Sequence, residues 1–381
     1  MSRRACALLA AGLATFSTAA LAGPESGLEL SGYYKNLLAG SRTVFPEGQR
    51  YALDLNRLRL ELKGDLAPGA ALDLQYDNEI LLGNYLHTAQ FGLLKDQPPP
   101  QYWNLEWNYA EAGPYYGLHR LYRGSVTLAA GDTDVRIGRQ RIAWGTGRFW
   151  SPLDILNPFS ATQIEREQRI GVDAVLIERR FGALSRLSAV YAPGHGAVDA
   201  SAALRWHANS AGIDYSFVAG RFVSDQVAGV DIATQLGDAG LRAELTGARR
   251  EDGSSQRRAL VGLDYAFRNT LSLSGEFYYN GAGAADRSAY DFASLFAGTI
   301  QSVGRRYFGG YAGYEITPLL KSTNYLVVNL GDRSRYFSPN LIYSLSTDVD
   351  LTLGAQLFSG GQGSEYARLN DTFYAQIQWY F

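Results

Sequence analysis

The chain has almost no cysteine. Of its 381 residues only Cys6 is a cysteine, and it lies close to the N-terminus. A chain with a single cysteine can form no internal disulfide and no thiolate metal site. Methionine is equally scarce, with one residue, and lysine occurs only at four positions. Nearly all of the positive charge is therefore carried by arginine, which makes fixed, forked contacts with carboxylates and phosphates.

Long hydrophobic runs are also missing. After the N-terminal segment the sequence has no run of about 18 apolar residues, the length that a transmembrane helix needs. The formal net charge is −2, so no general field for nucleic acid exists and no nucleic-acid partner is expected. Glycine (42) and tyrosine (25) are by contrast abundant. This composition suits the tight turns and aromatic belts of a β-barrel, which can satisfy every backbone group inside a membrane.

The N-terminus is typical of a secretory leader. A pair of arginines precedes an apolar run over residues 5–16, and small residues at positions 20 and 22 form a cleavage pattern. We expect residues 1–22 to be a Sec-type signal peptide and residues 23–381 to form one domain in the outer membrane.

Apolar and polar residues alternate through most of the remaining chain. Between Val349 and Leu357, for example, Asp350, Thr352 and Gln356 separate apolar residues. Alternation of this kind gives a strand one apolar and one polar face. The sequence therefore predicts an all-β fold, a transmembrane antiparallel β-barrel of about 18 strands, with a range of about 16 to 20. The candidate strands are 28–39, 51–63, 71–82, 118–130, 135–144, 169–180, 184–192, 199–207, 212–222, 226–236, 241–250, 256–267, 271–280, 305–316, 323–331, 335–345, 349–358 and 371–381.

The connections between these strands alternate in length. Every second one is short and rich in turn residues, as at 131–134 and 237–240. Outer-membrane barrels have short periplasmic turns and long extracellular loops. We therefore expect the short connections to be periplasmic and the long ones to be extracellular.

The C-terminal segment carries a second targeting feature. It alternates from Thr372 onward and ends with Ile377, Trp379 and Phe381 on one face. This ending resembles the C-terminal signal of bacterial outer-membrane proteins. The resemblance implies recognition by the outer-membrane assembly machinery and contact with membrane lipid and lipopolysaccharide.

Charged residues fall on the inward parity of several strands. We place Arg57, Arg59, Glu61, Arg242 and Glu244 inside the lumen, opposite outward leucines. Interior charges of this kind are solvated or paired across the wall.

Aromatic residues gather in two predicted loops. Trp103 and Trp107 lie in the long loop 84–117, and Trp144 and Trp150 lie near the loop between the fifth and sixth strands. Two interpretations of the first pair stay open, an ordered lid over the barrel mouth and a stacking platform for a sugar or ring.

The loop between the fifth and sixth strands is the most specific segment. By position it is the third extracellular loop, which in general porins folds into the lumen and narrows it. Charges of alternating sign could set a field across such a constriction, although a salt-bridged structural brace is the alternative. Ile137 and Arg139 share a parity, so we also expect a bulge near Gly138. The predicted constriction residues are Arg139, Arg141, Arg148, Asp154, Glu165, Arg166 and Arg169.

Several motifs together resemble a known family. The segments 119–123, 138–141, 144–145, 152–154 and 157–158 are similar to a group of poorly characterised proteobacterial outer-membrane proteins. These in turn resemble the eighteen-stranded alginate-export and porin-like barrels. The resemblance implies passive passage of a solute or polymer through a lumen whose arginines favour anions.

The sequence thus predicts a porin-like channel for small, anionic solutes. The alternatives are an exporter of an acidic polysaccharide and a binding or scaffold barrel with a plugged lumen. We expect no enzyme, because His195 and His207 lie in turns without a nucleophile motif. No metal or cofactor motif is found, and the sequence does not indicate an oligomeric state.

Overall fold

The computed structural model describes residues 27–97, 101–158, 161–164, 170–194, 199–296 and 300–381. The predicted signal peptide lies outside these residues, and so do Glu165, Arg166 and Arg169. Among the described residues, no helix has both the length and the apolar composition needed to cross a membrane.

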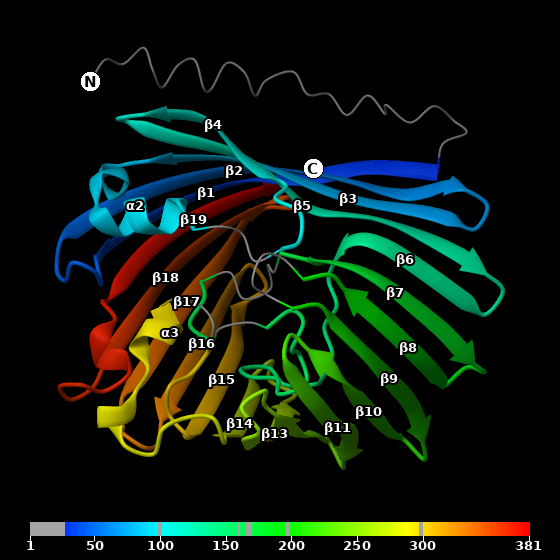
Figure 1. The fold of residues 1–381 in the computed structure, drawn as a ribbon. Coiled ribbons are helices and arrows are strands. Elements are labelled where there is room, and N and C mark those ends of the chain that lie inside the picture. The colour runs from blue at the N-terminus through cyan, green and yellow to red at the C-terminus, as the bar shows by residue number, and fades with distance from the viewer. Residues whose placement is uncertain (1–26, 98–100, 159–160, 165–169, 195–198, 297–299) are drawn as a thin grey trace.

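The described chain is almost entirely antiparallel β-structure, and 18 of its 19 strands form one closed barrel (Figure 1). The 18 strands predicted from alternation correspond to these barrel strands. The strands are β1 (Gly27–Arg42), β2 (Arg50–Ala67), β3 (Ala70–Leu82), β4 (Glu106–Ala112), β5 (Tyr115–Ala130), β6 (Thr133–Gln140), β7 (Val172–Phe181), β8 (Ser185–Ala192), β9 (Ser201–Ser210), β10 (Ile213–Phe222), β11 (Asp225–Leu236), β12 (Ala239–Arg249), β13 (Ser255–Ala266), β14 (Ser272–Asn280), β15 (Arg306–Thr317), β16 (Leu320–Asn329), β17 (Arg335–Ser346), β18 (Val349–Ser359) and β19 (Thr372–Tyr380). The short helices are η1 (Asn84–His87), α2 (Ala89–Lys95), η2 (Arg287–Ala289), α3 (Phe292–Phe296) and η3 (Tyr366–Arg368).

The first and last strands close the ring. β1 pairs with β2 on one side and with β19 on the other, both antiparallel. The backbone of the final residue, Phe381, exchanges two hydrogen bonds with Gly32, at 2.9 and 3.0 Å. Closure removes the unpaired edges that an open sheet would expose to lipid.

The strand outside the ring, β4, was not predicted. It lies within the segment expected to be a long loop, and it pairs with β5 along Tyr115–Arg120. On the same edge of β5, β6 begins to pair only at Gly124. β4 is short and mostly exposed, without the alternation that marks the barrel strands, so no periodic pattern indicates it.

Connections sort by length between the two ends of the barrel. Figure 1 shows α2, α3 and the other long connections at one end and the tight turns at the other. One two-residue turn, at 223–224, lies among the long loops, so the expected sorting by length is not complete. The short turns at the opposite end are 68–69, 131–132, 182–184, 211–212, 237–238, 267–271, 318–319 and 347–348.

Side-chain exposure follows the parity of each strand. On β12, Arg242, Glu244 and Thr246 are buried, while Leu245, which lies between the last two, is 50% exposed. On β14, Glu276 is fully buried and its neighbour Phe277 is exposed. On these two strands, polar residues therefore face the interior and apolar residues face outward, as the alternation predicts.

The orientation in the membrane stays a prediction and can be tested by labelling. Ser254 lies in a loop at the long-loop end, and Asp238 lies in a tight turn at the other end; both are exposed. We expect Ser254→Cys, but not Asp238→Cys, to react with a membrane-impermeant thiol reagent on whole cells. Labelling at position 238 and not at position 254 would show that the barrel has the opposite orientation.

Candidate functional site

The connection between β6 and β7 folds into the barrel. We call residues 141–158 and 161–164 of this connection the inward loop. Its apolar side chains join two clusters with interior residues of the wall. One contains Ile142, Trp144 and Leu153 with Leu176, Val190, Ala203, Val218, Phe222 and Val227 of β7 to β11. The other contains Phe149, Trp150 and Ala161 with Leu260, Tyr278, Tyr307, Val327, Tyr336 and Tyr366.

The inward loop reaches the opposite wall. The ring of Trp150 stacks on Tyr278 of β14 at 5.2 Å and lies 5.4 Å from the ring of Tyr307 of β15. Farther along, the backbone oxygen of Thr162 accepts a hydrogen bond of 2.7 Å from Gln356 of β18. The loop therefore contacts wall strands from β7 to β18, and it occupies the lumen as predicted for a third loop.

Two interior carboxylates hold the backbone of the inward loop. Four consecutive N–H groups, at positions 146–149, donate to Glu244 of β12 and Glu276 of β14. Glu244 also accepts from the backbone of Leu153 at 3.1 Å and from the hydroxyl of Ser151 at 3.0 Å. Hydrogen bonds to a charged acceptor are stronger than neutral ones. The N···O distances are 2.5 Å from Thr146 and 2.7 Å from Gly147 to Glu244, and 2.6 Å from Arg148 and 2.8 Å from Phe149 to Glu276.

An arginine supports the second carboxylate. Arg242 of β12 donates from Nε to Glu276 at 2.9 Å, and its terminal nitrogens bond Asp264 and, at 2.9 Å, Ser274. The predicted interior residues Arg242 and Glu244 thus belong to the framework of the loop. Glu276 completes this framework, and its inward parity on β14 was the only sequence signal for it.

Arg139 lies in a different place from the one expected for a constriction residue. It is 3% exposed and forms an ion pair with Asp173 of β7 at 2.9 Å. Its other nitrogens donate to the backbone oxygens of Leu121 and Trp103, at 3.2 and 2.5 Å. These contacts lie along the edge of β5, at the point where pairing with β4 ends and pairing with β6 begins. Arg139 therefore links the strands on either side of this gap in the pairing.

The bulge expected near Gly138 is absent from the pairing of β6. Its register with β5 and with β7 continues without a shift. Gly138 instead adopts a φ of 122°, which lets the strand remain paired.

Two of the predicted constriction residues are exposed on the inward loop. Arg141 is exposed, and the side chain of Arg148 is 46% exposed. Arg148 lies 3.6 Å from Asp264 and 5.4 Å from the ring centre of Tyr311. Asp154 is buried. Of the seven predicted charges, the structure therefore places two cations on the accessible surface of the loop, and three others lie outside the described residues.

The predicted interior residues Arg57 and Arg59 form a buried ladder on β2. Arg59 makes a forked contact with Asp77 of β3 at 2.6 and 2.6 Å, and Arg57 lies 2.7 Å from Glu79. The guanidinium of Arg59 also lies 3.8 Å from the ring centre of Tyr122. These charges pair across the wall. The remaining member, Glu61, contacts Lys63 at 2.5 Å.

The four predicted loop tryptophans divide into two pairs. Trp144 and Trp150 are buried and anchor the inward loop. Trp103 and Trp107 are exposed at and beside β4. Only the second pair has accessible ring surface for stacking.

Several loops at the long-loop end of the barrel meet at Glu365, which is almost completely buried. Its carboxylate accepts hydrogen bonds from Tyr307 and Asn329, both at 2.8 Å, and from the backbone of Val303 at 3.3 Å. Burial raises the pKa of this carboxyl to about 7, and the nearby charge of Asp332 acts in the same direction. Because Tyr307 packs against Trp150, this cluster supports the far end of the inward loop.

No known family profile matches the chain, and no curated protein matches it in sequence. Solved structures do match it. The outer membrane protein OpdK of Pseudomonas aeruginosa aligns with a TM-score of 0.58 and 11% identity, covering 93% of this chain and 98% of OpdK. OccK8 (OprE) of the same species aligns with a TM-score of 0.58, 10% identity and the same coverage. OccAB1 of Acinetobacter baumannii gives 0.56 and 10%, covering 93% and 96%. The chain therefore has the fold of these outer-membrane barrels.

The carboxylate anchor of the inward loop generates a testable prediction. Glu276→Ala leaves two backbone N–H groups and the Nε of Arg242 without their acceptor, at a cost of ~3 kcal/mol. We expect single-channel recordings of this variant to show frequent partial closures that the wild type lacks. Glu315→Ala is the control, because that carboxylate is exposed and pairs with Lys321 near a tight turn. Equal current noise in wild type and Glu276→Ala would argue against the anchor.

The raised pKa of Glu365 predicts a pH-dependent loop cluster. The folded state holds this proton more tightly than an exposed glutamate with its ordinary pKa of 4.5. Its stabilising contribution is therefore complete below about pH 4.5 and is lost as pH rises through about 7. Hydrogen exchange at residues 303–305 and 363–367, corrected for intrinsic rates, should be faster at pH 8 than at pH 5.5. Glu365→Gln should remove the difference; an unchanged difference would assign it to another group.

Proposed function

We propose that the protein is a porin-like outer-membrane channel for passive passage of small solutes, with a preference for anions. The observation that carries the proposal is the inward loop, which crosses the lumen and exposes Arg141 and Arg148. The carboxylates beneath it, Glu244 and Glu276, are buried and engaged by loop N–H groups. The accessible charge of the loop is therefore positive, which favours anions where the path narrows.

A small-molecule channel is also supported by one of the structural neighbours. OpdK of Pseudomonas aeruginosa has a crystal structure with vanillate. Export of an acidic polysaccharide, the alginate-export alternative, is less compatible with an inward loop fixed to β12, β14 and β18. The plugged binding barrel differs from the channel in one measurable property, because a plugged barrel does not conduct.

The proposed location in the outer membrane rests on the fold and on the predicted targeting segments. Ile377 and Phe381 are exposed on the outer face at the closing strand, where lipid and the assembly machinery could reach them. Their role as an assembly signal stays a prediction.

Bilayer recording tests the function. Under a salt gradient the purified protein should conduct and give a reversal potential on the anion side. Replacing Arg141 and Arg148 together by glutamine should lower the anion preference about threefold, because two lumen charges are removed. Arg221→Gln is the matched control, since Arg221 is an exposed arginine paired with Asp199 near a rim.

Two results would contradict the proposal. An unchanged reversal potential in the double variant would make the loop a brace without a role in selection. A wild-type protein that never conducts would leave the plugged barrel as the better description.

A further inference from the structure

The outer face of the barrel carries polar side chains where β1, β2, β3 and β5 lie side by side. Cross-strand partners share a face. Asn36 pairs with Asn56, and Leu38, which is 50% exposed, pairs with Asp54. The interior residue Arg57 lies on the opposite parity and is buried. We call the following residues the outer polar band: Tyr34, Asn36, Asp54, Asn56, Tyr76, Asn78, Tyr109 and His119.

The first half of the band is built around a carboxylate. Asn36 donates to Asp54 at 2.6 Å, and Asn56 donates to the same oxygen at 3.0 Å. Tyr34 donates to the oxygen of Asn56 at 2.6 Å. These bonds link β1 to β2, so the polar groups run around the barrel.

The second half is built around His119 of β5. Its Nδ1 contacts the hydroxyl of Tyr76, and the amide of Asn78 lies 3.3 Å away. From β4, the ring of Tyr109 lies 4.3 Å from the imidazole, and its hydroxyl is 3.3 Å from Asn78. The band therefore continues across β3 and β5 to β4.

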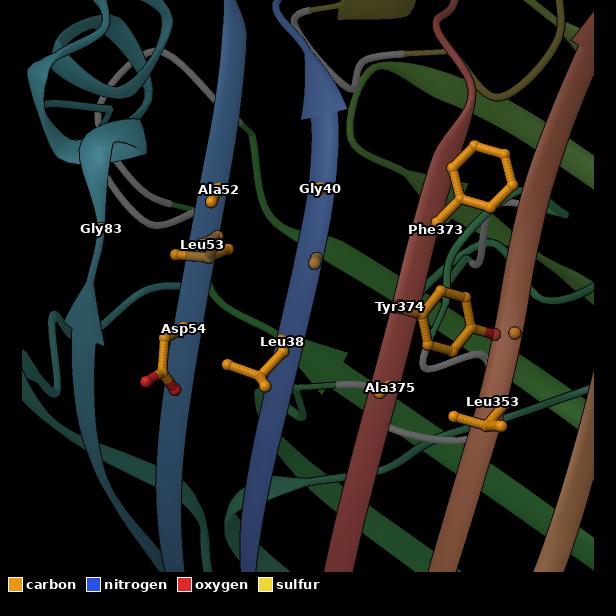
Figure 2. A pocket seen from close by; sticks show the side chains of 12 residues that line it. Leu38, Gly40, Ala52, Leu53, Asp54, Gly83, Leu353, Phe373, Tyr374 and Ala375 are labelled. Atoms are coloured by element: carbon orange, nitrogen blue, oxygen red, sulfur yellow. The ribbon is translucent and has the colours of Figure 1, made fainter.

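An apolar hollow adjoins the first half of the band. Figure 2 shows Leu38, Phe373 and Leu353 around it, with Gly40 and Ala375 between them. Phe373 is 60% exposed. Large side chains beside small ones give this surface an uneven shape, into which the side chains of a partner protein can pack.

Lipid is a poor partner for this surface. Acyl chains offer no hydrogen bonds, and a barrel face in contact with them is normally an apolar belt. Leu245 of β12 and Val261 of β13 show such a face on the far side of the barrel. Anionic lipid headgroups are disfavoured beside the carboxylate of Asp54.

We infer that the outer polar band and the adjoining hollow form an interface with a second copy of this chain. All copies insert into the membrane in one orientation, so the symmetry axis lies along the membrane normal and brings residues of equal depth together. Because the band runs around the barrel, the bands of two neighbouring copies then come into contact at the same depth. It contains both amide and hydroxyl donors and the acceptor Asp54, so it can pair with its own copy.

Mass and cross-linking test the interface. The purified wild type should have the mass of an oligomer by light scattering with detergent subtracted. Asn36→Leu with Asp54→Leu should convert it to a monomer that keeps its heat-modifiable migration, the mark of a folded barrel. In native membranes, Leu38→Cys should be captured by a bifunctional thiol reagent. Leu245→Cys is the control, because Leu245 is also 50% exposed on the outer face. This variant should not be cross-linked.

The alternatives give different results. A monomeric wild type would overturn the interface, and lipopolysaccharide retained by that monomer would identify lipid as the occupant. An oligomer that survives the double substitution and cross-links at position 245 would place the contact elsewhere. If the double variant does not fold, cross-linking at position 38 decides, because that chain keeps the band intact.

Discussion

The need to pair every backbone N–H and C=O group without help from water is the constraint on which this structure depends. A sheet in a membrane meets it only by closing, and here the closure joins Gly32 to the last residue, Phe381. Once the ring is closed, the parity of each residue decides between lipid and lumen. The interior is therefore determined strand by strand, and its charges follow from the same alternation that makes the outside apolar.

The inward loop and the wall satisfy each other. Interior carboxylates such as Glu276 need donors, and the backbone N–H groups at 146–149, which lie outside any helix or strand, supply them. Interior apolar residues such as Val218 and Leu260 likewise need cover, which Leu153 and Phe149 provide. The loop is consequently a fixed part of the barrel. Its path leaves Arg148 accessible because the backbone of that residue, and not its side chain, is held by Glu276.

The sequence was sufficient for the barrel strands and insufficient for the interior. A strand such as β10, expected at 212–222 and observed at Ile213–Phe222, is encoded by local alternation. The anchor of Arg148 is not local, because its acceptor Glu276 lies 128 positions away. β4 and the short α2 were missed because neither has a long periodic pattern. The parity of Glu276 in the sequence predicts that it faces inward. Only the fold shows that it accepts hydrogen bonds there from the inward loop and from Arg242.

Arg139 illustrates how two arginine roles can be confused in a sequence. Its neighbours suggested a bulge and a position in the lumen, yet Gly138 keeps the strand paired through its positive φ. Arg139 then fills the seam beside β4, where it bonds Asp173 and two backbone oxygens. An arginine with all of these partners fixes the wall and has little capacity to bind a solute. Arg141, by contrast, is exposed, so the proposed selection is assigned to exposed arginines of this kind and not to the number of arginines in the chain.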